Sequence, residues 1–307
     1  MDMKELKTFV TLAEVLNYQK ASGILNYAPS TLAHHIQIIE GELNKRLFDR
    51  EGRNLTLTED GEKFAAYAGE LLALYQDAVN SLSTEGEVAR VAIAGSEATT
   101  GYCIGDILSR FAEGHPNIHL ELFGGPNSAT PDLVSRGIAE LGFYYAFDRA
   151  HLPGIRDIAL FREPNALICL ATNPLAVRTG LHYEDLAGAS FAFPHDDCLC
   201  AVDILEKLKQ RGVTYGSISC PGSMPSVIDL AVRDGAILSL PYSAGEYLAR
   251  HHNMAILDLD EEKTWVYARA LFRQRAKLSL PAQDLLAFVR NCAAVRRREQ
   301  PALCLEA

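Results

Sequence analysis

The sequence lacks long apolar runs, and this absence limits the class of protein. No segment approaches the ~20 apolar residues that a membrane-spanning helix requires. The first nine residues, MDMKELKTF, have neither the basic start nor the apolar stretch of a secretory signal peptide. We therefore expect a cytoplasmic protein without a membrane partner.

Cysteine is sparse and odd in number. The chain of 307 residues has seven cysteines, scattered between Cys103 and Cys304. Disulfide frameworks belong to short secreted chains with even numbers of cysteines, so these thiols are expected to be reduced and mostly buried.

Local signatures of catalysis are also missing. No G-x-S-x-G, H-E-x-x-H or P-loop sequence occurs. The segment around Ser96 comes nearest to G-x-S-x-G but has alanine at both glycine positions of that motif. The side chains of adjacent histidines, as at 34–35 and 251–252, diverge and do not readily share one metal ion. The sequence predicts no enzyme, no catalytic residue, no cofactor and no metal.

An excess of positive charge is lacking too. The formal net charge is −10, and residues 1–60 hold seven basic against nine acidic side chains. Such a balance disfavours nucleic acid, because neutralised phosphates supply most non-specific affinity. Four basic residues nevertheless gather between Lys45 and Arg53, so one tip of this region is positive.

What is present begins with an N-terminal pattern of helices and a hairpin. Apolar residues at helical spacing predict three helices, over residues 3–16, 19–26 and 29–44. The apolar stripe of the third helix leaves polar residues on its other faces, among them Ser30, Thr31, His34 and His35. Residues 47–58 have strand-like ends around a charged turn, which predicts a small hairpin. This order is that of a winged helix-turn-helix.

A long linker helix is expected next. Thr58 is predicted as its N-cap, with Glu59 and Asp60 in the first turn, where the helix dipole favours negative charge. Six residues form a heptad seam typical of a helix paired with its copy in a second chain: Phe64, Ala68, Leu71, Tyr75, Ala78 and Leu82. The alternative is a helix docked on its own chain. The periodicity breaks at residues 83–87, where we expect a domain boundary.

From residue 88 the pattern is that of an α/β domain with a largely parallel sheet. Short apolar runs predict strands at residues 88–94, 119–123, 141–146, 166–171, 190–193, 236–240 and 254–259. Small polar residues that open a helix gather in four loops, at residues 95–100, 124–128, 194–198 and 221–224. Because open α/β sheets bind ligands beyond the carboxyl ends of their strands, converging loops would form a small-molecule cleft.

The N-terminal motifs resemble the DNA-binding domain of LysR-type transcriptional regulators. The pattern E-x-E-L-x-x-x-L-F-x-R begins at Glu40 and ends at Arg50, and L-T-x-x-G follows from Leu57 to Gly61. The resemblance spans nearly the whole chain. It implies a bacterial α/β regulator in which a winged helix-turn-helix joins, through a dimerising linker helix, to an effector domain of two subdomains. That domain would have the type II periplasmic-binding-protein-like fold.

The resemblance also implies DNA-contacting residues. Carried over position by position, they are Lys20, Pro29, Ser30, Thr31, His34, His35, Arg50 and Arg53. The chain departs from the family's usual pattern, because Ala28 stands where an N-cap serine is common, Ala33 replaces another serine, and His34 replaces arginine or lysine. The operator need not resemble a relative's. For Arg50, an ion pair with a neighbouring carboxylate is an equal alternative.

The family's cleft positions fall on the four polar loops. They are Ser96, Thr99, Thr100, Asn127, Ser128, His195, Cys198, Cys200, Ser223 and Met224. No lysine or arginine lies in these loops, and Glu97, Asp196 and Asp197 would oppose a carboxylate effector unless they cap helices. A neutral or amine-bearing effector therefore stays open. An alternative function is a thiol- or metal-sensing regulator that uses Cys198, Cys200 and His195.

The predicted organisation has three parts. Residues 1–58 form the DNA-binding domain, 59–87 the linker helix, and 88–307 the effector domain. Within the effector domain, residues 88–163 and 267–307 are assigned to subdomain one and 164–266 to subdomain two. The expected partners are double-stranded DNA, a small-molecule effector, and further copies of the chain in a homodimer and a homotetramer.

Overall fold

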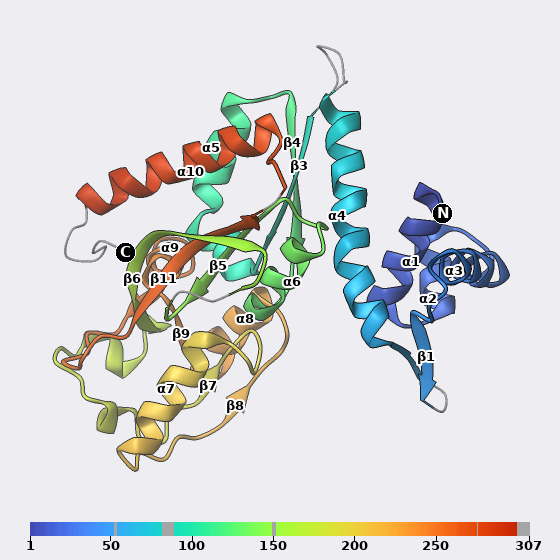
Figure 1. Ribbon diagram of the computed structural model, residues 1–307. Coiled ribbons are helices and arrows are strands. Elements are labelled where there is room, and N and C mark those ends of the chain that lie inside the picture. The colour runs from blue at the N-terminus through green and yellow to red at the C-terminus, as the bar shows by residue number, and fades with distance from the viewer. Residues whose placement is uncertain (52–53, 82–88, 149–151, 275, 300–307) are drawn as a thin grey trace. The chain divides into compact units, whose positions relative to one another are not determined.

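The computed structural model describes residues 1–51, 54–81, 89–148, 152–274 and 276–299 (Figure 1). Arg53, Leu82, Cys304 and the expected boundary at residues 83–87 lie outside the described residues. The chain divides into two compact units. The first is Met1–Glu87 with two short segments, Ser135–Ile138 and Arg275–Ser279, and the second holds the remainder.

Three helices form the centre of the first unit. They are α1 (Met3–Val15), α2 (Tyr18–Leu25) and α3 (Pro29–Leu43). The side chain of Asp2 caps α1 by accepting hydrogen bonds from the amides of Lys4 and Glu5, each at 2.8 Å. By contrast, Ala28 precedes α3 and makes no side-chain cap, as its missing hydroxyl dictates.

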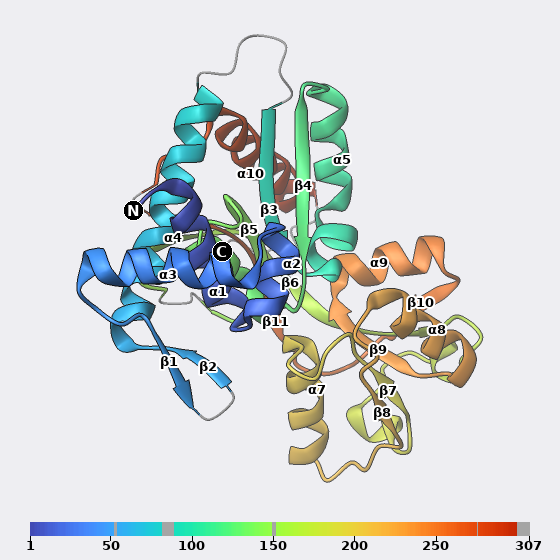
Figure 2. The same ribbon diagram turned by 90° about the vertical axis from the view of Figure 1, so that its right-hand side faces the viewer.

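A hairpin and a long helix complete this unit. Strands β1 (Phe48–Glu51) and β2 (Asn54–Leu57) pair antiparallel, and α4 spans Glu59–Ser81. The Thr58 hydroxyl accepts a hydrogen bond of 2.9 Å from the amide of Gly61, so the predicted N-cap is confirmed. Figure 2 shows the hairpin extending from the three helices.

The core of the first unit joins all of these elements. The Phe9 ring lies 5.4 Å from the Phe48 ring and 4.9 Å from the Phe64 ring, so α1 packs on both the hairpin and α4. The other fully or almost fully buried apolar residues are Leu6, Leu12, Ala21, Leu32, Ile36, Ile39, Leu47 and Ala68. This arrangement is the predicted winged helix-turn-helix.

The second unit is built on one nine-stranded sheet. Its order is β4-β3-β5-β11-β6-β9-β7-β8, with β10 also paired to β6. The strands are β3 (Ala89–Gly95), β4 (Ile118–Gly124), β5 (Leu141–Ala146), β6 (Ile155–Leu170), β7 (Phe191–Ala192), β8 (Ile218–Ser219), β9 (Ile237–Pro241), β10 (Met254–Ile256) and β11 (Trp265–Arg273).

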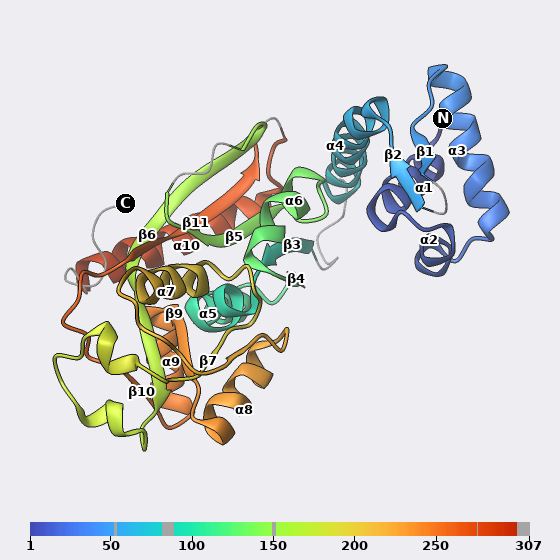
Figure 3. The same cartoon turned by 90° about the horizontal axis from the view of Figure 1, so that it is seen from below.

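Two long strands connect two groups of elements within this unit. Figure 3 shows β6 and β11 running side by side, in agreement with their antiparallel register. One group carries α5 (Gly105–Gly114), α6 (Thr130–Ser135) and α10 (Leu280–Glu299). The other carries α7 (Leu199–Gln210), α8 (Met224–Asp234) and α9 (Tyr242–His251). The result is the expected effector-domain fold of two subdomains joined by two crossover strands. None of the helices in the described ranges is long and apolar enough to span a membrane.

The expectation of a largely parallel sheet was wrong. Strand β3 pairs parallel with β4 and β5, and β7 with β8 and β9, but every pairing of β6 and β11 is antiparallel. The first half of β6 escaped prediction because charged residues interrupt its apolar pattern. Asp157 of β6 and Arg269 of β11 form a buried ion pair at 2.6 Å across these two strands, which makes those charges part of the core.

Candidate functional site

One face of α3 is polar and exposed. Ser30, His34 and Gln37 are exposed at helical spacings of four and three residues, opposite the buried stripe of Leu32, Ile36 and Ile39. The sequence of α3 contains no lysine or arginine. Its exposed groups are therefore hydroxyl, imidazole and amide, which form hydrogen bonds with base edges but carry no fixed positive charge.

The other residues predicted to contact DNA lie on α2, on α3 and in the hairpin region. Lys20 and Pro29 are exposed, and Thr31 is half-buried. Arg50 lies on strand β1 of the hairpin; its side chain is not described, and Arg53 lies outside the described residues. Lys45 and Arg46, which the prediction did not include, are exposed between α3 and the hairpin.

His35 is in a different position from His34. Its Nδ1 atom lies 2.8 Å from the Thr8 hydroxyl, and its ring meets the Tyr27 ring edge-on at 5.7 Å. The Thr8 hydroxyl donates its only hydrogen to the carbonyl of Lys4 at 2.9 Å, so it must accept from His35, whose Nδ1 is then protonated. His35 thereby fastens α3 to α1.

The acidic residues around α3 are partly used inside the fold. The Glu40 carboxylate accepts hydrogen bonds from the amides of Leu47 and Phe48, at 2.7 and 3.2 Å, and so holds the hairpin against α3. Asp60 pairs with Lys45 at 3.0 Å on the surface. The acidic balance of this region thus reflects structural contacts as well as solvated charge.

The predicted seam along α4 has two parts. Phe64 and Ala68 pack into the core of the first unit. Leu71 and Tyr75 are 44% and 51% exposed, and Ala78 is exposed as well. Leu82, the last residue of the seam, is not described. An apolar stripe therefore lies uncovered along the second half of α4 in the single chain.

The four polar loops of the second unit meet at a cavity of about 50 Å³. Seven of the ten predicted cleft residues line it: Ser96, Thr99, Asn127, His195, Cys198, Cys200 and Met224. Thr100, Ser128 and Ser223 do not line it. Glu97 and Asp197, which the sequence placed in these loops as acids opposing a carboxylate effector, line the cavity as well. The prediction did not name the other lining residues: Ala98, Gly125, Tyr145, Pro194, Leu199, Leu240 and Pro241.

Two hydrogen bonds cross between the two sides of this cavity. The Glu97 carboxylate accepts a bond of 2.8 Å from the backbone amide of Met224, the first residue of α8. The hydroxyl of Ser128 donates to the carboxylate of Asp197. Glu97 and Asp197 are two of the acidic residues that the sequence analysis expected to repel a carboxylate effector unless they cap helices. Glu97 does cap a helix, α8, which lies on the other side of the cleft.

Local hydrogen bonds hold several of the polar residues that line the cavity. Ser96 accepts from the amide of Thr99 at 3.2 Å, and its hydroxyl lies 2.8 Å from the Thr99 hydroxyl. The amide group of Asn127 donates to the carbonyl of Tyr145 at 2.7 Å and accepts from the Tyr145 amide at 2.9 Å. Asn127 therefore fixes its loop to β5 with both of its polar atoms.

Cys198 is the most acidic thiol of the cavity wall. It stands at the N-cap of α7, and its pKa is lowered to about 7 by a hydrogen bond from Cys200 and by the amides of Ala201 and Cys200, against the opposing effect of burial. The pKa of Cys200, fully enclosed, is raised. Across the described ranges, no group of three or more histidine, cysteine or acidic side chains is placed to hold a metal ion.

A buried network links the cavity to a crossover strand. Glu163 of β6 accepts hydrogen bonds from the hydroxyl of Tyr145, from the amide and hydroxyl of Ser243, and from Arg296 at 3.2 Å. Tyr145 also lines the cavity, so this one side chain joins the cavity wall to β6. Nothing in the local sequence indicated this network, since its members lie far apart in the chain.

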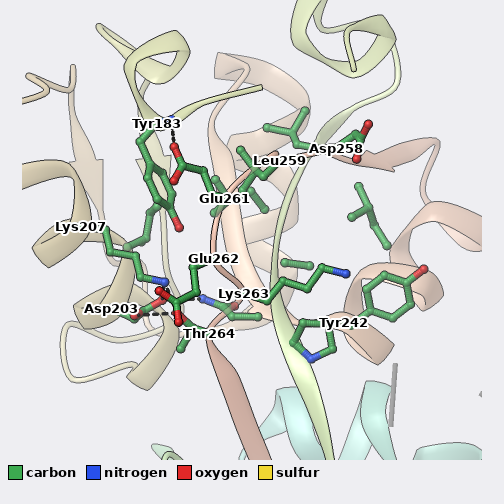
Figure 4. A pocket seen from close by; sticks show the side chains of 17 residues that line it. Tyr183, Asp203, Lys207, Tyr242, Asp258, Leu259, Glu261, Glu262, Lys263 and Thr264 are labelled. Carbon is green, nitrogen blue, oxygen red and sulfur yellow. Dashed lines mark hydrogen bonds and ion pairs between the residues drawn. The ribbon is translucent and has the colours of Figure 1, made fainter. Parts of the chain in front are cut away.

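A second, larger pocket lies beside the same crossover strands and was also missed. It has a volume of about 310 Å³ (Figure 4). Lys207 of α7 donates to the Thr264 hydroxyl and pairs with Asp203 at 3.3 Å, and Thr264 donates to Asp203 at 3.0 Å. This cluster ties α7 to the chain segment that enters β11.

Two family models match the chain. A model described as "Bacterial regulatory helix-turn-helix protein, lysR family" matches residues 3–62, and one described as "LysR substrate binding domain" matches residues 84–294. The HTH-type transcriptional activator IlvY of Salmonella typhimurium is 31% identical over 189 residues, which are 58% of this chain and 62% of IlvY. The match thus spans less than two thirds of that relative.

Solved structures share the fold. ArgP from Mycobacterium tuberculosis aligns with a TM-score of 0.68 at 15% identity, over 96% of this chain and 98% of that one. CbnR complexed with its target DNA aligns with a TM-score of 0.61 at 19% identity, over 95% and 99%. The substrate-binding model alone matches more than half of the residues of this chain. The chain therefore belongs to the LysR family of bacterial regulatory helix-turn-helix proteins.

Proposed function

We propose that this protein is a cytoplasmic, sequence-specific DNA-binding transcriptional regulator whose affinity for DNA is modulated by a small molecule in the cleft of its second unit. The observation that carries the proposal is the exposed polar face of α3, a helix whose opposite stripe of Leu32, Ile36 and Ile39 is buried in the core of the winged helix-turn-helix. The relative IlvY is a transcriptional activator, which favours regulation over catalysis.

The proposed organisation follows the sequence boundaries. Residues 1–58 bind DNA, 59–87 pair two chains, and 88–307 bind the effector, with 88–163 and 267–307 in one subdomain and 164–266 in the other. The uncovered stripe of Leu71 and Tyr75 on α4 supports pairing of two copies. Pairing of dimers would give the homotetramer.

On DNA, two α3 helices would enter successive major grooves about one helical turn apart. Ser30, Thr31 and His34 would contact bases or phosphates from α3, while Lys20, Arg50 and Arg53 would contact the backbone. His35 would act through α3 rather than on DNA, because its Nδ1 already bonds Thr8. The solved complex of CbnR with its target DNA supports this arrangement for the shared fold.

The effector would bind in the cavity that the four polar loops surround. Ser96, Thr99, Asn127, His195, Cys198, Cys200 and Met224 line it, and Thr100, Ser128 and Ser223 support the same loops. A ligand changes DNA affinity only if it binds one arrangement of the protein better than another. The hydrogen bonds of Glu97 and Asp197 across the cavity favour its closed arrangement, and the Tyr145–Glu163 contact connects it to β6.

Thiol sensing is a second candidate function, and the acidity of the Cys198 thiol favours it. This thiol lines the cavity with its pKa lowered to about 7. Cys200 beside it is buried with a raised pKa, which leaves one reactive thiol rather than a pair.

The function is tested by fluorescence anisotropy with the purified chain. His34→Ala is expected to weaken binding to the operator by roughly 5- to 150-fold relative to unrelated duplex, because a base-edge contact is worth about 1–3 kcal/mol. His119→Ala, which removes an exposed histidine from β4, is the matched control and should bind as the parent does. Equal loss on operator and unrelated DNA would contradict base reading by α3.

A further inference from the structure

The cavity between the two subdomains carries acid and no base of fixed charge. Glu97 and Asp197 are the carboxylates in its lining, and none of the sixteen residues that line it is lysine or arginine. Glu97 and Asp197 are exposed at its rim, while Thr99, Tyr145 and Met224 are buried beneath them. A ligand that enters therefore meets negative charge first.

The helix N-termini that face the cavity are already occupied. The amide of Met224 at the start of α8 donates to Glu97 at 2.8 Å. At the start of α7, the amides of Ala201 and Val202 donate to the backbone carbonyl of Cys198 at 2.9 and 3.0 Å. Helix N-termini commonly bind the anionic group of a ligand through such free N–H groups. Here the protein's own acceptors take those groups.

Much of the remaining polar lining is already engaged in hydrogen bonds, and the His195 imidazole stands beside the two carboxylates as a donor. Both polar atoms of the Asn127 side chain are bonded to Tyr145, and the Tyr145 hydroxyl donates to Glu163. The carboxylates of Glu97 and Asp197 each accept one hydrogen bond across the cleft, which leaves lone pairs available on both. A carboxylate ligand would meet both rim carboxylates, and the lining offers it the His195 imidazole but no lysine or arginine, whereas an ammonium group would pair with the two carboxylates.

We propose that the effector of this cleft is a small molecule that bears a protonated amine and no carboxylate, a selectivity that rests on the proposed effector-binding function. The Glu97 carboxylate occupies the N-terminus of α8, where a ligand anion would otherwise bind, and its hydrogen bond to Met224 joins the two sides of the cleft. The ammonium group binds between Glu97 and Asp197 and neutralises the repulsion between two subdomains that each bring one carboxylate to the rim. The cavity volume of about 50 Å³ restricts the ligand to a few heavy atoms.

The direct test is the thermal stability of the full-length chain, without DNA, in the presence of small amine, anionic and neutral probes. Ethylammonium and ethanolamine are the amine probes, with propionate as the anion and propionamide as the neutral analogue. The melting temperature should rise with both amines, and isothermal titration should give one site per chain. Stabilisation by propionate that equals or exceeds stabilisation by ethylammonium overturns the proposal, and so does the absence of any response to the amines.

Two variants locate the effect at Glu97. Glu97→Gln keeps an oxygen that can accept from Met224 but removes the charge, and should weaken ethylammonium binding at least tenfold. Glu206→Gln removes the same charge from the exposed face of α7, outside the cavity, and should bind ethylammonium as the parent does. Equal affinity in the parent and Glu97→Gln overturns the assignment.

Glu97→Ala supplies an independent measurement. It vacates the N-terminus of α8, so acetate should now bind and raise the melting temperature of this variant while leaving the parent unchanged. Because these readouts do not involve DNA, they are separable from the regulator function. Amine binding that has no effect on DNA affinity would count against the proposed regulation and leave the ligand class standing. An unresponsive Glu97→Ala variant would remove Glu97 as the internal anion.

Discussion

The Glu163 carboxylate of β6 accepts hydrogen bonds from both the amide and the hydroxyl of Ser243, at 2.8 and 2.7 Å. Glu163 is fully buried, and the same carboxylate binds Arg296 and the Tyr145 hydroxyl. Strand β6 passes between the subdomains at this point, so one buried charge holds together the start of α9, the end of α10 and the cavity wall.

Glu163→Ala is expected to destabilise the chain by about 3–5 kcal/mol, because it leaves Arg296 without its buried partner. Chemical denaturation followed by circular dichroism measures this change. Glu262→Ala, at an exposed position, is the control and should stay within about 0.5 kcal/mol of the parent. A loss below about 1 kcal/mol at Glu163 would show that the network adds little.

The adjacent histidines of α3 should separate into two phenotypes. His35→Ala breaks the hydrogen bond to Thr8 and the ring contact with Tyr27, and should cost about 1–2 kcal/mol of stability. His34→Ala should leave stability unchanged, because that side chain is exposed, and should reduce operator affinity. Thermal denaturation measures the stability of both variants, and anisotropy measures their operator affinity. If both variants lost stability and affinity to the same extent, the separate roles of the two histidines would be refuted.

Cys198 should react with iodoacetamide at lower pH than an ordinary thiol. Only the thiolate is the nucleophile, and with the pKa lowered to about 7 its population falls by half as the pH drops to about 7. Cys220, whose pKa is raised by burial, serves as the internal reference and should react only at higher pH. Mass spectrometry of the labelled peptides measures both rates. Parallel profiles for the two cysteines would contradict the lowered pKa.

Leu71→Asp should weaken self-association at least tenfold, because it places a charge in the uncovered apolar stripe of α4. Sedimentation velocity over a range of protein concentrations measures the change. Val177→Asp adds the same charge at a position that is 83% exposed in the second unit, and should leave the association state as it is. An unchanged association constant for Leu71→Asp would move the dimer contact away from this helix.

The sequence predicted the first unit closely because its signals are local. The spacing of Leu32, Ile36 and Ile39 identifies the buried side of α3, and a threonine before two acidic residues marks the start of α4. In the second unit the polar loops were found, and seven of their ten predicted residues line the cavity.

The missed features depend on contacts between distant segments. Glu97 and Met224 are 127 positions apart, so no local pattern could show that one caps the other's helix. The first half of β6 was missed because Asp157 and Glu163 look like surface charges, whereas the fold pairs them with Arg269 and Arg296. His35 looked equivalent to His34 until the position of Thr8 was known.

The central claim is tested most directly by a footprint of the full-length chain on the DNA upstream of its own gene, at physiological salt and with excess unrelated duplex. The account predicts two protected half-sites related by two-fold symmetry and about one helical turn apart, ~10 base pairs centre to centre. His34→Ala should lose this protection, and His119→Ala should keep it. If excess unrelated duplex removed the protection by the parent chain as readily as it removes the protection by His34→Ala, sequence-specific recognition by α3 would be contradicted.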